Sequence, residues 1–290
     1  MPSISSVAIV GGTHGNELTG IHLINNLAGG IHSLPDSLDY SFLIANPDAV
    51  AANTRFIDVD LNRQFTLNNL AYQANSLYEL NLAQTINRKI GPKDNPRTDL
   101  VIDIHNTTSH MGATLIVLES NDFYRNMAAY LKQHMPSAHI LVEDEVSYLE
   151  HPYLCTCGRY GIMLELGAQP QGVCRADIYA QSVEMLGHIL EYVVLNNREA
   201  VPEFGGFEAY RLLEVMHFPL SEEEKLLGLV HPNIQDRDFS VLEPGQPMFL
   251  MFDGSCINYN GEQSVYPHFI NEAAYKSSAV AFATADKFIW

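Results

Sequence analysis

Over about the first 198 residues, apolar runs of strand length alternate with amphipathic stretches of helix length, and this alternation most constrains the fold. The short apolar runs end in glycine, proline or polar residues, and apolar residues recur at helical spacing in the segments between them. Strands that alternate with helices predict an α/β fold, in which a sheet lies between layers of helices. In open α/β sheets, functional residues gather at the carboxyl ends of the strands.

The expected elements follow from these patterns. Strands are predicted over residues 5–12, 41–47 (closed by Pro47), 99–105, 112–120 and 160–167. Helices are predicted over 17–30, 72–90, 121–135 and 175–197, and residues 91–99 are expected to form a plain loop. From about Val201 onward, turns rich in Pro and Gly separate short apolar runs such as PMFLMF and AVAFA, which predicts a β-rich region. We therefore expect one domain over residues 1–200 and a smaller one over residues 201–290.

The charge of the chain narrows its partners. Its formal net charge is −18 at pH 7, from 16 basic and 34 acidic residues. Nucleic acids and anionic membranes are polyanions, so we expect neither as a partner. No apolar run approaches the roughly 20 residues that cross a bilayer, and the early run VAIV is too short for a signal-peptide core. We expect a soluble, cytoplasmic protein, in which arginines gathered in a pocket would be local exceptions to a negative background.

Four cysteines are too few for a disulfide scaffold in a chain of 290 residues. Cys155 and Cys157 form a C-x-C pair, for which a zinc or redox role is conceivable. No second cysteine pair lies at the spacing of a zinc site, so the main interpretation is that both thiols are structural.

The stretch GGTHGNE follows the first predicted strand and carries His14 and Glu17. Zinc takes imidazole nitrogen and carboxylate oxygen, and catalytic zinc sites use three protein ligands with an open position. The glycines on both sides would let the backbone turn tightly and approach a metal. His105, at the end of a later predicted strand in DIHNTTSHMG, is the best placed third ligand.

Other interpretations of these residues stay open at this point. A lone H-x-x-E is a weak metal signal, and His105 by itself could be a structural histidine. His110, five residues further on, is a competing ligand in the loop beyond the strand. Glycines after a strand could instead cradle a phosphate, but the stretch lacks both G-x-x-x-x-G-K-[ST] and G-x-G-x-x-G.

The stretch TRFIDVDLNRQF places Arg55, Asn62 and Arg63 close together in a chain that has few basic residues. A guanidinium grips a carboxylate with two parallel hydrogen bonds and stays charged at any working pH. The stretch therefore predicts an anion clamp, to which Asn62 adds an amide donor. The alternative is a solvated loop in which Asp58 and Asp60 pair with the arginines.

Motifs along nearly the whole chain resemble the aspartoacylase family. They are GGTHGNE, the Asn-Arg pair of DVDLNR, DIHNTTSHMG, the glutamate of LELGAQPQGVCRADI, HPNIQDRDF, PMFLMFDG and VYPHFINEAAY, in the order that the family has. Members are zinc-dependent amidohydrolases with a zinc-carboxypeptidase-like fold. The resemblance implies a mixed sheet flanked by helices, a smaller β-rich C-terminal domain that narrows the entrance to the active site, and one Zn²⁺ per subunit.

The resemblance also implies a role for each matching residue. His14, Glu17 and His105 match the zinc ligands. Glu165 matches the general base that activates water and then protonates the leaving amine; the alternative for this residue is a strand-end ion pair. Arg55 matches the residue that steadies the oxyanion. The matching substrate-binding residues are Arg55, Asn62, Arg63, Glu165 and Tyr275.

The implied reaction is the hydrolysis of a small anionic N-acyl-L-amino acid, with N-acetyl-L-aspartate cleaved to acetate and L-aspartate as the leading expectation. In aspartate-specific members, the segment before the general base is longer and carries a Tyr and an Arg that grip the side-chain carboxylate. Here that segment is shorter, Arg159 fits a different family position, and Tyr148 or Tyr153 could replace the tyrosine. The alternatives are therefore a deacylase of N-acetyl aromatic amino acids or mercapturates, and a succinylglutamate desuccinylase.

A non-catalytic binding module is the alternative from another class. Its signature would be a lost ligand or a lost base, whereas all three ligands and Glu165 are present. Homo-oligomers are common among cytoplasmic enzymes, so a homo-oligomer is expected without a motif that supports it.

Overall fold

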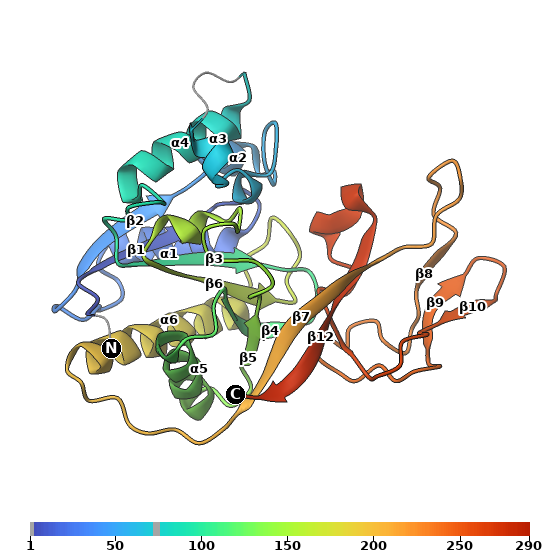
Figure 1. Ribbon diagram of the computed structural model, residues 1–290. Coiled ribbons are helices and arrows are strands. Elements are labelled where there is room, and N and C mark those ends of the chain that lie inside the picture. Colours follow the sequence, from blue (N-terminus) through green and yellow to red (C-terminus); the bar gives the residue numbers. More distant parts are fainter. Residues whose placement is uncertain (1–2, 72–75) are drawn as a thin grey trace.

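A mixed nine-stranded sheet forms the centre of the molecule in the computed structural model, which describes residues 3–71 and 76–290 (Figure 1). Its strand order is β11-β12-β7-β5-β4-β6-β3-β1-β2. The strands are β1 (Ser6–Gly11), β2 (Asp39–Ile44), β3 (Leu100–Asn106), β4 (Gly112–Val117), β5 (His139–Val142), β6 (Tyr160–Gly167), β7 (Glu208–His217), β11 (Tyr266–His268) and β12 (Val280–Ile289). Strands β2, β1, β3 and β6 are parallel neighbours, while β4 runs antiparallel to β6. The predicted α/β fold with a mixed sheet is therefore confirmed.

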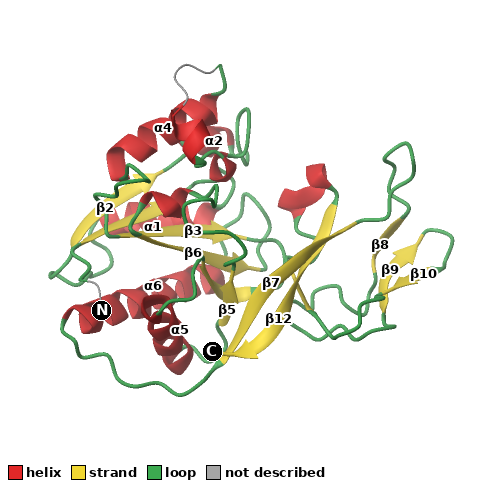
Figure 2. Ribbon diagram, in the orientation of Figure 1, coloured by secondary structure: helices red, strands yellow, loops and turns green. Residues whose placement is uncertain are grey.

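Helices cover both faces of this sheet (Figure 2). The helices are α1 (Leu18–Ala28), α2 (Pro47–Ala52), α3 (Leu67–Ala71), α4 (Tyr78–Ile90), α5 (Asp122–His134) and α6 (Ala176–Asn197), with 3-10 turns η1 (Leu61–Arg63), η2 (Leu154–Cys157) and η3 (Ala273–Ser278). Alternate residues of β1 enter different clusters: Val7 and Ile9 pack with α1, α5 and α6, whereas Ala8 and Val10 pack with α4 and η2. This alternation is what a strand buried on both faces requires.

Residues beyond 200 form the expected smaller β-rich part of the chain, but three of its strands join the central sheet. Strand β7 pairs in parallel with β5 through Leu141↔Tyr210 and Val142↔Arg211, and β12 and β11 extend the same sheet. A second, three-stranded sheet of β8 (Gly228–Val230), β9 (Pro247–Met251) and β10 (Cys256–Asn258) lies beyond the long β7–β12 ribbon (Figure 1). The sequence does not predict the pairing of β7 with β5, because β5 is only four residues long.

Three local expectations need correction. Pro47 starts α2 instead of closing a strand, and the side chain of Asn46 accepts a hydrogen bond from Ala49 N as the cap of that helix. The helix expected over 72–90 begins at Tyr78, and residues 72–75 of that expectation lie outside the described residues. The loop 91–99 is not plain, since Lys93 is 1% exposed and donates to the carbonyls of Phe65 and His151.

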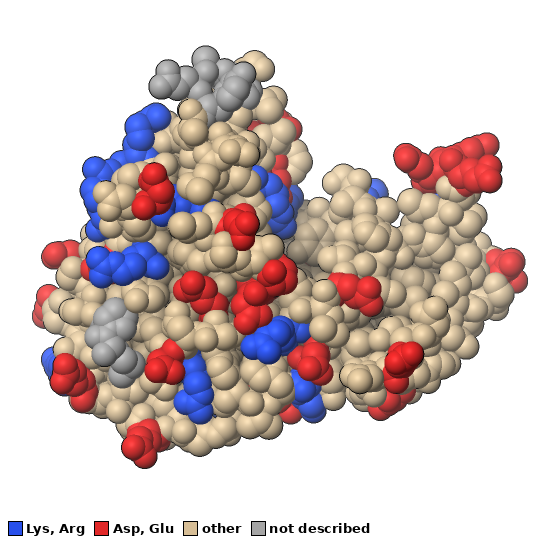
Figure 3. Space-filling view, viewed as in Figure 1, with Lys and Arg blue, Asp and Glu red and all other residues tan. Residues whose placement is uncertain are grey.

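Figure 3 shows acidic and basic side chains interspersed over one face of the molecule, with acidic ones gathered at the tip beside β8. Glu222, Glu223 and Glu224 are exposed in the loop that leads to this strand. Over the part of the chain that the structure describes, no helix combines the length and the apolar character needed to span a bilayer.

Two glycines of GGTHGNE are required by backbone conformation and by packing. Gly12 has a φ of +65°, a left-handed conformation that a side chain disfavours. A Cβ atom on Gly15 would lie 2.0 Å from the carbonyl carbon of Ala49, so only glycine lets this turn lie against α2.

We expect Gly15→Ala to destabilise the protein by about 1–3 kcal/mol or more, because backbone atoms of α2 would have to move. The free energy of unfolding in urea measures this. The matched control is Gly187→Ala, since a Cβ atom on Gly187 in α6 meets nothing within 4 Å. That variant should be about 0.5–1 kcal/mol more stable than the wild type. Equal effects of the two substitutions would contradict the packing role of Gly15.

Candidate active site

Three neighbouring parallel strands bring the predicted residues together. His14 lies in the turn after β1, His105 near the end of β3, and Glu165 near the end of β6. His105 and Glu165 are register partners, and β1 pairs with β3 up to Gly11↔Ile104. The carboxyl ends of these strands therefore open onto one pocket, as the α/β alternation predicts.

His14, Glu17 and His105 form a buried cluster whose ligand atoms all lie within 4.8 Å of one another. Each of the three residues is 3% exposed. The Nδ1 atom of His14 lies 2.7 Å from Glu17 Oε1, and the Nδ1 atom of His105 lies 3.0 Å from Glu17 Oε2. Two imidazole nitrogens and a carboxylate thus face a common point, which is the donor set of a catalytic zinc site.

A further carboxylate contacts the Nε2 atom of each imidazole. His14 Nε2 lies 2.9 Å from Asp60 Oδ1, and His105 Nε2 lies 2.9 Å from Asp103 Oδ2. Thr13 Oγ1 donates to the other oxygen of Asp103. Carboxylates in this position keep the proton on Nε2 and leave Nδ1 free as a ligand. The residues present therefore fit a metal ion. The sequence pattern does not assign Asp60 and Asp103 to this supporting role, although Asp103 and His105 lie on the same face of a strand.

The electrostatics favour an ionised Glu17. Burial opposes its charge, but the attraction of His14 and His105 outweighs burial and holds the pKa of Glu17 well below its ordinary value. A carboxylate that is ionised over the working pH range is the form that binds a cation.

Glu165 has the opposite electrostatic environment. Its side chain lines the same pocket and the residue is 9% exposed. Burial raises the pKa of Glu165 well above its ordinary value; His105 lowers this pKa, while Glu17 and Glu272 add to the rise. Two carboxyl groups in one pocket with pKa values pushed apart are typical of acid–base chemistry.

Arg55 and Asp60 border the cluster. Arg55 Nη1 lies 3.1 Å from Glu17 Oε1, while its Nε and Nη2 donate to Asp60 Oδ2 at 3.1 and 3.0 Å. The pairing of Asp60 with an arginine matches the alternative interpretation of this stretch, whereas Asp58 accepts a hydrogen bond from Tyr78 N. Glu79 of α4 accepts backbone N–H bonds from residues 57–59 and so fixes the loop that carries Arg55.

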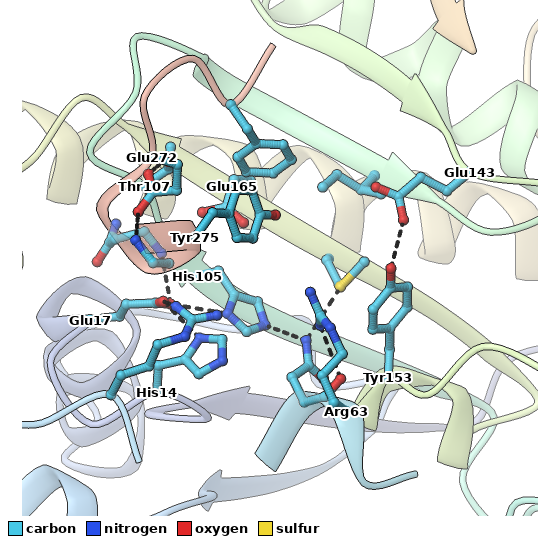
Figure 4. Close-up of a pocket in the computed structure, with 17 residues that line it drawn as sticks. His14, Glu17, Arg63, His105, Thr107, Glu143, Tyr153, Glu165, Glu272 and Tyr275 are labelled. Atoms are coloured by element: carbon cyan, nitrogen blue, oxygen red, sulfur yellow. Dashed lines mark hydrogen bonds and ion pairs between the residues drawn. The ribbon is translucent and has the colours of Figure 1, made fainter. Parts of the chain in front are cut away.

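Asn62 and Arg63 lie on η1 and line the pocket. Figure 4 shows Arg63 on the side of the pocket away from His14. The side-chain oxygen of Asn62 accepts from Leu154 N at 2.8 Å, and its Nδ2 lies 3.5 Å from His105 Nε2. The guanidinium of Arg63 lies 5.1 Å from the ring centroid of Tyr153. Both residues therefore line the pocket beside the cluster.

The C-terminal part of the chain closes the pocket from above in Figure 4. Tyr275 lies on η3 and lines the pocket with Phe269, Glu272 and Ala274. The Glu272 carboxylate accepts hydrogen bonds from Thr108 N at 2.6 Å and from the hydroxyl group of Thr107. This contact ties the segment that bears Tyr275 to the end of β3.

Three residues that the sequence analysis considered for the site lie outside the pocket. His110 has a side chain that is 52% exposed and lies 3.3 Å from Asp236. Arg159 pairs with Asp99 at 3.3 Å, and the Tyr148 hydroxyl donates to the carbonyls of Cys155 and Gly158.

Cys155 and Cys157 are buried and free. Burial raises the pKa of the Cys157 thiol to about 12 and that of Cys155 well above its ordinary value. High pKa values disfavour the thiolate that metal or redox chemistry needs, which supports the structural interpretation of both cysteines.

The chain belongs to the succinylglutamate desuccinylase/aspartoacylase family, as its motifs predict. A model of the succinylglutamate desuccinylase/aspartoacylase catalytic domain matches residues 3–193, and a model of the AstE/AspA barrel-sandwich hybrid domain matches residues 205–287. Aspartoacylase from Mus musculus is 41% identical over 98% of this chain and 93% of its own length. The N-acyl-aromatic-L-amino acid amidohydrolase (carboxylate-forming) from Homo sapiens is 40% identical over 97% of this chain and 90% of its own. The crystal structure of murine aminoacylase 3 superposes with a TM-score of 0.93 at 35% identity, covering 100% of this chain and 97% of that one.

Proposed function

We propose that this protein hydrolyses the amide bond of N-acyl-L-amino acids, releasing a carboxylate and a free amino acid, with one Zn²⁺ held by His14, Glu17 and His105. The observation that carries the proposal is the convergence of these three donors with Glu165 in one buried pocket. The relatives named aspartoacylase and N-acyl-aromatic-L-amino acid amidohydrolase support the reaction class. A zinc ion held there would supply Lewis-acid chemistry, which polarises a carbonyl group and acidifies water.

The side chains of this protein would carry the proton and the charges. Glu165 takes the proton of the attacking water and returns it to the leaving amine, which its raised pKa favours. Arg55 faces the cluster and stabilises the negative charge that develops on the carbonyl oxygen. Asn62 and Arg63 hold the substrate carboxylate, and Tyr275 completes the wall of the pocket.

Two candidates remain for the amino-acid half of the substrate. N-acetyl-L-aspartate is the leading expectation, and the similarity to an aspartoacylase supports it. An N-acetyl aromatic amino acid is favoured by the lining, because Ile116, Met163 and Phe269 give apolar surface next to Tyr153 and Tyr275. The human relative named for N-acyl-aromatic substrates supports this second candidate.

The division into a catalytic domain of residues 1–200 and a capping domain of residues 201–290 is part of the same proposal. The contribution of Glu272 and Tyr275 to the pocket supports it. A homo-oligomeric state and a cytoplasmic location stay predictions.

The test is a comparison of kcat/KM on N-acetyl-L-aspartate, N-acetyl-L-tyrosine and N-succinyl-L-glutamate with the zinc-loaded protein. We expect kcat/KM for one of the two N-acetyl amino acids to exceed kcat/KM for N-succinyl-L-glutamate by about tenfold or more. A pocket commonly supplies specificity of this order. Preference for N-succinyl-L-glutamate would identify the protein as a succinylglutamate desuccinylase instead. Absence of turnover on all three would contradict the proposed reaction.

A further inference from the structure

Glu143 adds a further carboxyl group to the wall of this pocket, besides Glu17, Glu165 and Glu272. It follows directly after β5 and is only 6% exposed. The Tyr153 hydroxyl donates a hydrogen bond to Glu143 Oε2 at 3.2 Å. Nothing in the sequence pattern singles out this residue, since β5 itself is too short to be predicted.

Glu143 lies at the end of the pocket that is remote from the metal-ligand cluster. Figure 4 shows His14 and Glu17 on one side, Arg63 between, and Glu143 with Tyr153 on the other side. Arg63, Glu143 and Tyr153 also line an adjoining cavity of about 410 Å³, whereas the pocket at the cluster offers about 50 Å³. A substrate whose amide lies at the cluster and whose α-carboxylate lies at Arg63 would extend its side chain toward Glu143.

The pocket offers little positive charge with which a second carboxylate of the substrate could pair. Among the described residues that line it, the arginine other than Arg63 is Arg55, which already pairs with Glu17 and Asp60. A side-chain carboxylate near Glu143 would therefore face a like charge whenever Glu143 is ionised.

We propose that Glu143 determines which side chain the pocket accepts: its carboxylate excludes a second negative charge and accepts a hydrogen bond from a neutral donor such as a side-chain amide. This inference rests on the proposed function, because it concerns the amino-acid half of the same substrate. When Glu143 is ionised, it disfavours N-acetyl-L-aspartate and favours a substrate without a side-chain carboxylate, such as the N-acetyl aromatic candidate. It assigns Glu143 to specificity and leaves the catalytic groups unchanged.

The charge of Glu143 changes near neutral pH. Burial raises the pKa of Glu143 to about 7, Glu145 adds to the rise, and Arg63 and the Tyr153 hydroxyl oppose it. Tyr275 and Cys155 also face this carboxyl group, and burial keeps both of them neutral over the same range. Below about pH 7, Glu143 is neutral and can donate a proton to a substrate carboxylate; above it, the two carboxylates repel each other.

The experiment uses two substrates that differ in one charge, N-acetyl-L-aspartate and N-acetyl-L-asparagine. The ratio of kcat/KM for asparagine over aspartate is measured from pH 6 to pH 9, and ionisations common to both substrates cancel in this ratio. For a substrate that is not turned over, its Ki against N-acetyl-L-phenylalanine replaces kcat/KM. We expect the ratio to rise about tenfold through pH 7, as a change of one pK unit in interaction would give.

Glu143→Gln should make the ratio independent of pH and shift it toward aspartate by about tenfold at pH 9. The matched control is Glu150→Gln, which removes the same charge from an exposed position in the same loop and should keep the wild-type profile. A ratio that is flat in the wild-type protein, or a slope that persists in Glu143→Gln, would overturn the inference alone. Failure to turn over any of the three N-acetyl substrates would overturn the proposed function and the inference with it.

Discussion

Glu165→Ala should lower kcat by a factor of about 10²–10⁴ while the protein keeps its zinc, because a positioned acid–base group contributes a factor of this size. Glu165 lies in the pocket beside the cluster but is not one of its three ligand residues. Steady-state kinetics and metal analysis on the same preparation measure the two properties together.

The conservative variant Glu165→Gln separates chemistry from shape. It keeps the volume of the side chain and removes its ability to take a proton, so its kcat should fall as far as that of Glu165→Ala. Near-normal turnover in either variant would exclude Glu165 as the base. Loss of zinc along with activity would show that Glu165 helps to hold the metal.

Arg55→Ala should lower kcat by about 10²–10³, the usual cost of removing one preorganised donor to a developing oxyanion. The guanidinium contacts both Glu17 and Asp60, so it is already held at the edge of the cluster. We expect KM to change much less than kcat, because the interaction strengthens only in the transition state.

Arg55→Lys is the matched variant for this prediction. It retains a positive charge but loses the planar donor geometry, and should recover part of the lost kcat. Since Arg55 also pairs with Glu17, zinc content must be measured in both variants. Full activity in Arg55→Ala would contradict the oxyanion role, and a drop in activity that simply follows loss of zinc would make Arg55 a residue that positions Glu17.

Local patterns predict the first two-thirds of the fold well because its strands and helices are long and buried. The predicted strand over 160–167 agrees with β6, and the helix predicted over 175–197 agrees with α6 to within one residue. The attachment of β7 to β5 could not be predicted, since it depends on a four-residue strand and on pairing between distant segments.

The inner part of the candidate site could be predicted because its residues lie in distinctive motifs at strand ends. Its supporting groups could not, because their roles depend on three-dimensional neighbours. Asp60 contacts His14 across 46 residues of sequence, and Glu272 reaches Thr107 across 165. Glu143 gave no signal at all, since a glutamate after a short strand is ordinarily a solvated residue.

The central claim is that His14, Glu17 and His105 hold one zinc ion, and metal stoichiometry tests it most directly. The wild-type protein should bind one zinc per chain, and His105→Ala should lose it. His110→Ala is the matched control, because His110 is near in sequence but exposed and outside the cluster, and it should retain one zinc. A wild-type protein without zinc at saturating supply, or a His105→Ala protein with full zinc content, would contradict the account.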